Sequence, residues 1–164
     1  MRNLYIIILL GLSSAAFSQN RVKEIGLRGG YTSGVTFRVQ LEETLSYEAQ
    51  AGYRNNGSVL SLYRQQHHTL GMDQMGNWDL IYGFGAHAGF YFTDHYQILF
   101  RDVYFGREFF TPVVGMDGYI GIEYQLVEIP VTFGCSFQPY MEISLKRIFG
   151  INLWDFGVHM SYRF

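Results

Sequence analysis

The sequence W-D-F-G-V-H-M-S-Y-R-F, at residues 154–164, predicts a strand with one apolar and one polar face. Successive side chains of an extended strand point to opposite faces, so residues two apart share a face. The even-numbered positions are Trp154, Phe156, Val158, Met160, Tyr162 and Phe164. The odd-numbered positions are Asp155, Gly157, His159, Ser161 and Arg163. An apolar face of this length has to be covered by a protein core or by lipid.

The same two-residue period continues along the chain from Glu24 onward, and no sustained 3.6-residue period interrupts it. It predicts eight strands, near 24–32, 35–41, 45–54, 58–67, 78–92, 113–126, 131–143 and 154–164. Asn55-Asn56-Gly57 is a hairpin signal, because these residues tolerate positive φ. Two longer connections are predicted, at 68–77 and 93–112.

The first 18 residues have the pattern of a cleavable signal peptide. Arg2 precedes the apolar run 4–12, and Ala16-Phe17-Ser18 has the small-x-small form found before a cleavage site. The alternative, a spanning N-terminal anchor, needs roughly 20 apolar residues, and this run is much shorter. Residues 1–18 are therefore predicted to be removed on export, and residues 19–164 to form one domain.

The composition is that of a chain with much apolar surface and little charge. Aromatic residues make up 18 % of the chain, charged residues 16 %, and the formal net charge is −2. A nucleic-acid-binding domain would show a basic face, and a soluble exported domain usually carries more surface charge. The single cysteine, Cys135, allows no internal disulfide. These features favour a β-barrel in a membrane.

A lipocalin-like soluble barrel, apolar inside, would show the same alternation. However, Tyr, Trp and Phe gather towards the strand ends, as in the aromatic girdles of membrane barrels. The opposite faces carry charges of both signs in mid-strand and many glycines, which suits a narrow, filled lumen. The predicted fold class is therefore all-β: a single eight-stranded antiparallel up-and-down barrel that crosses a membrane, with its apolar face towards lipid.

Four segments carry a resemblance to a known group: IGLRGGYTSGVTFR (25–38), GMDGYIGIEYQL (115–126), EIP (128–130) and VHMSYRF (158–164). With them the chain resembles the small eight-stranded outer-membrane β-barrel proteins of Bacteroidetes-type bacteria, in the broad OmpA-like membrane-domain and porin-family group. The resemblance implies a place in the cell outer membrane, in contact with its lipid. It also implies that the outer-membrane assembly machinery reads the ending at Tyr162 and Phe164. The group shares a scaffold and not one activity.

The polar face of the predicted strands collects residues of both charges. An eight-stranded barrel has room for side chains but not for an aqueous channel, and buried charges have to pair. The sequence therefore predicts a plugged lumen, and the alternative is a small-solute pore or a proton path. The predicted lumen network consists of Arg28, Arg38, Glu48, Arg54, His87, Asp117, Glu123, Asp155, His159 and Arg163.

His159 and Ser161 could suggest an enzyme, because they share a strand face. Lipid A deacylase barrels use such a His-x-Ser pair, but Tyr162 stands where that family has Asn. A hydrolase also needs an exposed nucleophile with a base and an orienting acid. A lipid A-modifying hydrolase is therefore the third hypothesis, behind the pore, and a protein without enzymatic activity is favoured.

A metal site could be suggested by His67-His68 together with Asp73. Adjacent histidines on a strand point to opposite faces and cannot bind one ion without a turn there. The sequence therefore predicts no metal and no other cofactor.

The 93–112 connection is the predicted contact surface outside the membrane. Exposed aromatics beside arginines are common at protein interfaces, and the candidate contacts are Tyr96, Phe100, Arg101, Tyr104, Arg107 and Phe109. The alternative is that these residues only extend the neighbouring strands. The predicted role is structural or interactive, for a monomer with no nucleic-acid partner and an unidentified external partner.

Overall fold

The computed structural model describes residues 21–72, 76–98, 101–144 and 149–164, and these form ten strands in one sheet. No helix in these ranges is long and apolar enough to cross a membrane. The strands are β1 (Lys23–Gly30), β2 (Ser33–Glu42), β3 (Leu45–Arg54), β4 (Gly57–Met72), β5 (Gly76–Ile98), β6 (Arg101–Leu126), β7 (Val131–Phe137), β8 (Tyr140–Ser144), β9 (Phe149–Asn152) and β10 (Phe156–Arg163).

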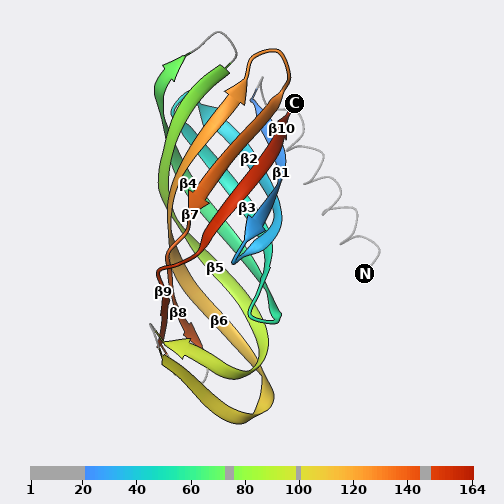
Figure 1. The fold of residues 1–164 in the computed structure, drawn as a ribbon, viewed down its shortest axis with the longest axis vertical. Coiled ribbons are helices and arrows are strands. Elements are labelled where there is room, and N and C mark those ends of the chain that lie inside the picture. The colour runs from blue at the N-terminus through green and yellow to red at the C-terminus, as the bar shows by residue number, and fades with distance from the viewer. Residues whose placement is uncertain (1–20, 73–75, 99–100, 145–148) are drawn as a thin grey trace, which may run out of the picture.

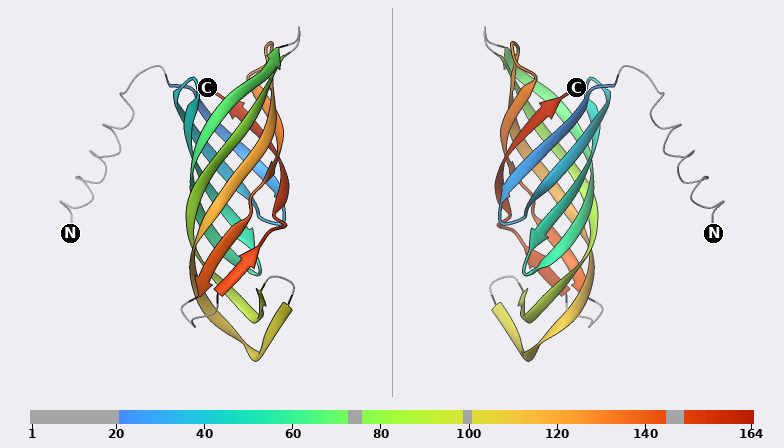
Figure 2. Two further views of the ribbon diagram at one scale, coloured as in Figure 1. Left: turned by 90° about the vertical axis from the view of Figure 1, so that its left-hand side faces the viewer. Right: turned by 90° about the vertical axis from the view of Figure 1, so that its right-hand side faces the viewer.

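The sheet closes on itself, because β1 pairs antiparallel with both β2 and β10. The backbones of Lys23 and Phe164 complete the seam, with each N–H donating to the other carbonyl. Every remaining neighbour pair is also antiparallel. Figures 1 and 2 show the resulting barrel of tilted strands, with the C-terminus at the end where β1 begins.

The ten segments make an eight-stranded barrel, because two of its strands are interrupted: β7 and β8 form one, and β9 and β10 form the other. β7 and β8 both pair with β6 and are separated at Pro139, which has no N–H to donate to a ladder. In the neighbouring strand, the adjacent residues Leu153 and Trp154 are both exposed, whereas a regular strand would turn one of them inward. This marks an irregularity between β9 and β10. The predicted closed eight-stranded antiparallel barrel is confirmed, while the predicted signal peptide (1–18) lies outside the described residues.

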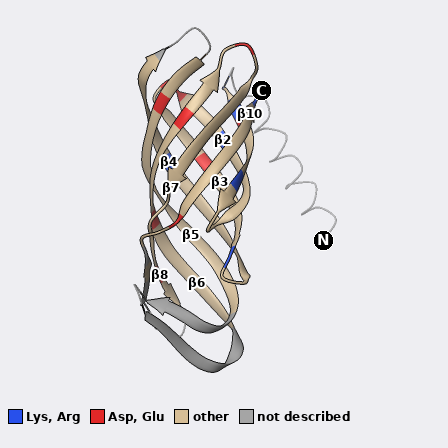
Figure 3. Ribbon diagram, viewed as in Figure 1, with Lys and Arg blue, Asp and Glu red and all other residues tan. Residues whose placement is uncertain are grey.

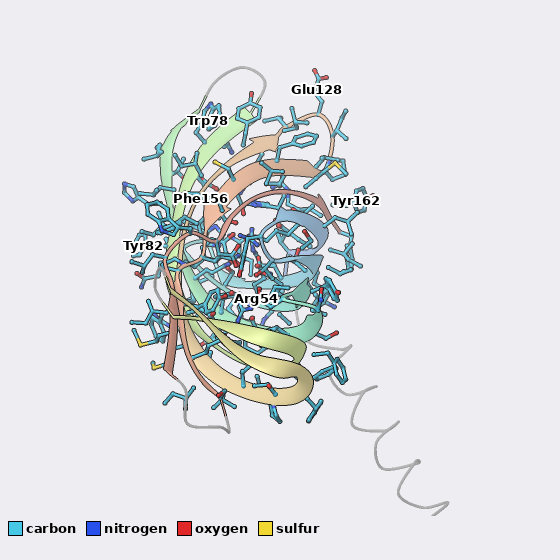
Figure 4. All side chains as sticks on the ribbon, turned by 60° about the horizontal axis from the view of Figure 1, so that its bottom comes forward. Arg54, Trp78, Tyr82, Glu128, Phe156 and Tyr162 are labelled. Atoms are coloured by element: carbon cyan, nitrogen blue, oxygen red, sulfur yellow. The ribbon has the colours of Figure 1, made fainter. Side chains whose placement is uncertain are left out.

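The barrel is polar inside and apolar outside. In β3, Ser46, Glu48 and Gln50 are buried, while Tyr47 between them is 48 % exposed. Figure 4 is turned so that the end of the barrel away from the C-terminus comes forward. It shows nitrogen and oxygen atoms gathered around Arg54 inside the barrel, and Tyr82 and Tyr162 on the outside. In the described part of the barrel the interior is therefore polar, unlike the apolar interior of a lipocalin-like barrel.

One end of the barrel, here called the turn end, carries the start of β1, the C-terminus and the connections 43–44 and 127–130. The opposite end, here called the projecting end, carries the β1–β2, β3–β4 and β5–β6 hairpins. The β3–β4 hairpin has the predicted turn, because Asn55 and Asn56 both have positive φ, 48° and 55°. A Cβ on Gly57 would lie 1.9 Å from the carbonyl oxygen of Phe90, so this position requires glycine.

Two predicted connections are wrong. β4 runs to Met72 and β5 starts at Gly76, so most of 68–77 is paired strand, with an irregularity between Thr69 and Gly71. Polar residues on both faces indicated a loop, but strand ends beyond the apolar wall can be polar on both faces.

The 93–112 segment is likewise mostly strand. β5 and β6 stay paired to Ile98 and Arg101, with an irregularity between Thr93 and His95. The pairing of β4 with β5 ends at Gly57 and Tyr91, so the β5–β6 hairpin continues past its neighbour. For the backbone, the alternative of extended strands is the one observed (Figure 2).

Candidate functional site

The lumen contains a turn-end cluster centred on Arg38. Its guanidinium donates in bidentate form to Glu123, with Nη1–Oε2 and Nη2–Oε1 distances of 2.8 and 2.7 Å. The same guanidinium contacts Glu48 at 2.7 Å and Glu24 at 3.3 Å. His159 Nε2 lies 2.8 Å from Glu123 Oε1. One arginine therefore holds three carboxylates, and charge-assisted, bidentate bonds of this kind are among the strongest in proteins.

A projecting-end cluster is centred on His87. The His87 ring lies between two carboxylates, with Nδ1 2.8 Å from Asp117 and Nε2 3.0 Å from Glu142. Arg54 donates to Glu142 at 3.1 Å and to the Tyr91 hydroxyl at 2.8 Å. An imidazole can donate to both carboxylates only when both of its nitrogens carry a proton. In that state the cluster holds two positive and two negative charges.

The third group is an ion pair that joins β1 to the irregular segment before β10. Arg28 Nη2 lies 3.0 Å from Asp155 Oδ1, and both side chains are about 1 % exposed. Asp155 also accepts hydrogen bonds from the hydroxyl and the backbone N–H of Thr32. Arg28 donates in addition to Ser136 Oγ at 3.2 Å. This pair and its hydrogen bonds connect the β1–β2 turn to β7 and to the segment before β10.

Two tyrosines separate the two clusters. In β6, Tyr119 lies between Asp117 of one cluster and Glu123 of the other. Its ring meets that of Tyr63 edge-on, with centroids 5.4 Å apart, and the Tyr63 hydroxyl donates to Gln138 Oε1. A cavity of about 10 Å³ remains between the turn-end cluster and Tyr119. That is about the smallest space that can hold one water molecule.

The structure brings nine of the ten predicted lumen residues into these three groups. The tenth, Arg163, lies nearer the turn end and donates to Gln125 Oε1 at 2.8 Å and to the carbonyl of Leu126. Figure 3 shows the charged positions spread along the height of the barrel.

Sequence reasoning missed Glu24, Tyr91 and Glu142 as members of these groups. Glu24 and Tyr91 were on the predicted polar faces but were not selected as network residues. Glu142 keeps the even-numbered alternation of Gln138 and could have been found by continuing it past Pro139.

The His159–Ser161 pair does not form a nucleophile–base contact among the described residues. His159 bonds Glu123, and the Ser161 hydroxyl donates to Glu24 Oε2 at 3.1 Å. His67 is buried against Ser46, with Nε2 and Oγ 2.7 Å apart, and His68 is exposed on the other face. Asp73 lies outside the described residues, and the described ones contain no group of ligands suited to a metal ion.

The outer face carries the two residues of the predicted assembly signal. Tyr162 is 51 % and Phe164 62 % exposed. The side chains of the candidate contact residues Tyr96, Phe100, Arg101, Tyr104, Arg107 and Phe109 lie outside the described part of the structure.

The described residues define a closed eight-stranded antiparallel β-barrel with many polar and charged side chains buried in its interior. Comparisons with family models, with curated proteins and with solved structures found no match. The predicted relation to the OmpA-like group therefore stays a prediction.

Proposed function

We propose that the chain is an outer-membrane β-barrel protein without enzymatic activity, with a structural or surface-interaction role. The observation that carries the proposal is the inverted distribution of polarity. Arg28, Arg38 and Glu123 are at most 5 % exposed, whereas Leu27 and Leu62 are 61 % and 63 % exposed. Soluble monomers rarely expose contiguous apolar patches larger than a few hundred Å², whereas lipid requires an apolar wall with no open edge.

Two groups of outward aromatic rings support this orientation. Trp78 and Tyr124 stack near the turn end, with ring centroids 4.8 Å apart. Phe90, Phe92 and Phe110 contact one another towards the projecting end, with centroids 5.6–5.7 Å apart. Membrane barrels carry an aromatic girdle at each interface, separated by an apolar band roughly 25 Å tall. In this proposal the turn end faces the periplasm and the β5–β6 hairpin extends outside the cell.

The single cysteine offers a direct test of the lipid-facing wall. Cys135 is exposed on the outer face in the middle of β7. A thiol reacts as the thiolate, which does not form in hydrocarbon. In vesicles the folded chain should therefore resist a water-soluble maleimide and react after unfolding. Rapid labelling of the folded chain in vesicles, or recovery of the chain as a soluble periplasmic protein, would contradict the proposal.

The filled lumen favours the plugged barrel over the pore. The tyrosine layer and the paired charges occupy the lumen, and the cavity beside Tyr119 has a volume of about 10 Å³, too small for a solute. The chain should therefore show no steady conductance in planar bilayers. Regular conductance steps would favour the small-solute pore, and a mass shift of lipid A after expression would favour the hydrolase.

A further inference from the structure

Arg64 is an exception on the apolar wall of the barrel. It lies in the middle of β4 (Gly57–Met72), and its outward neighbours Leu60 and Leu62 are about 60 % exposed. Arg64 pairs across the ladder with Tyr47 and Phe84, which are also on the outer face. The next outward residues of β4 towards the turn end, Gln66 and His68, are also polar, so Arg64 stands at the turn-end border of the apolar wall. If the wall faces lipid, as proposed above, this arginine lies within reach of lipid head groups.

The guanidinium of Arg64 has little to compensate it within the protein. Among the described residues it forms no ion pair or hydrogen bond, and its nearest aromatic partner is the Phe84 ring, 6.0 Å away. Described carboxylates on the outer surface occur only near the turn end, at Glu42, Glu43 and Glu128. The described part of a second copy would therefore bring no carboxylate to Arg64 from the middle of its wall, and symmetric pairing would place two like charges together.

A groove begins beside Arg64. It has a volume of about 380 Å³ and is lined by Gln66, Tyr82 and Phe84, and further on by Gly118, Ile120 and Pro139. Gly118 has no side chain to fill the wall next to Pro139, which leaves the hollow. Figure 4 shows Tyr82 on the outside of the barrel, where the groove opens. The site thus combines a cation and two polar side chains with an apolar floor, within the 300–1,000 Å³ range of small-molecule sites.

We propose that this groove binds an anionic membrane lipid, a proposal that rests on the outer-membrane function above. The lipid phosphate accepts hydrogen bonds from the Arg64 guanidinium, which matches phosphate geometry. Its acyl chain lies along Gly118, Ile120 and Pro139. The lipid supplies the counter-charge that the protein wall lacks.

The test measures lipid binding by native mass spectrometry of the detergent-refolded chain, titrated with phosphatidylglycerol or with phosphatidylcholine. The wild type should bind one phosphatidylglycerol saturably and in preference to phosphatidylcholine. Arg64→Met should weaken that binding roughly tenfold or more, as expected for loss of a charge-assisted contact. Lys23→Met removes another outward cation at the end of the wall and should leave binding unchanged.

A second variant tests the groove without changing charge. Ile120→Trp enlarges a side chain that is 53 % exposed, so it fills the groove without crowding the interior. It should weaken phosphatidylglycerol binding while Arg64 is intact. Inorganic phosphate should not compete at matched concentrations, because it lacks the acyl chain.

Several results would overturn the inference. Equal binding by the wild type and Arg64→Met would do so, as would an equal loss in Lys23→Met, which would indicate net charge alone. An Arg64-dependent complex with another protein, without lipid preference, would assign the site to a protein partner. Heat-modifiable gel mobility is measured on every variant. Its absence in the wild type would count against the membrane barrel itself, and its presence with no lipid preference would count against this site only.

Discussion

Removing Arg38 should destabilise the barrel more than removing any one of the carboxylates it contacts. Arg38 is 5 % exposed and contacts Glu24, Glu48 and Glu123. In Arg38→Met these three carboxylates would remain close together, and among the described contacts only that of His159 with Glu123 would remain in place of the guanidinium. Breaking a buried ion pair from one side costs about 3–5 kcal/mol, and that is the expected loss.

Glu123→Gln should cost less, about 1–3 kcal/mol, the range for losing hydrogen bonds to a charged group. Arg38 would keep Glu24 and Glu48, and the introduced amide would keep one acceptor oxygen of similar position. The sign of the difference follows from charge: the wild-type cluster has more carboxylates than arginines. Loss of one carboxylate is therefore partly compensated, whereas loss of the arginine is not.

The assay is urea unfolding in detergent micelles and in lipid vesicles, followed by the fluorescence of Trp78 and Trp154 and by heat-modifiable gel mobility. Arg64→Met is the matched control, because it makes the same chemical change on the outer wall. In zwitterionic micelles it should leave stability unchanged or raise it by up to about 1 kcal/mol. A smaller loss in Arg38→Met than in Glu123→Gln would refute the reasoning, and so would wild-type stability in both variants.

Three further predictions concern packing and turns. Gly157→Ala should destabilise the barrel by about 1–3 kcal/mol, because its Cβ would lie 2.6 Å from Cζ of Arg28 and displace it from Asp155; Gly29→Ala, with no atom within 4 Å of its Cβ, should be near neutral in the same unfolding assay. His87→Ala should cost about 1–3 kcal/mol, because Asp117 and Glu142 lose the ring between them; equal stability would show that the ring does not stabilise these carboxylates. Asn56→Ala should cost about 1 kcal/mol and Asn56→Gly almost nothing, because φ is 55° at this position; equal costs would show that the turn conformation does not limit stability.

The alternation of residues predicted which side chains face the lumen, but not which of them meet. Arg38 and Glu123 were both placed on polar faces, yet their bidentate contact joins β2 to β6, 85 residues apart. That contact depends on the tilt of the strands and the closure of β1 on β10, which a single strand does not encode. Tyr119 was likewise on a polar face, and its place between the two clusters became visible only with the packed lumen.

Strand lengths were predicted less well than strand faces. The hairpin at 55–56 was predicted, because Asn-Asn-Gly has a specific backbone preference. The ends of β4 and β5 were placed too early and the start of β6 too late, because polar and charged residues such as His68 were taken to end a strand. Such residues mark where the apolar outer face ends, but the strand can continue beyond that point. Backbone hydrogen bonds between strands form whether the side chains face lipid or water.

The register of β4 places Arg64 on the outer face of the barrel, where a charged side chain is unfavourable. A shift of β4 by one residue would bring Arg64 into the lumen, but it would also move all the remaining side chains of the strand to the opposite face. Tyr63, which is 3 % exposed and packs on Tyr119, would move to the outside. The lumen contacts of β4 thus keep Arg64 on the outer face, although an unpaired charge there is unfavourable in free energy and no group in the strand compensates it. A charge retained there against the local preference points to a partner that supplies the missing anion, and the binding comparison of Arg64→Met with Lys23→Met measures that partner directly.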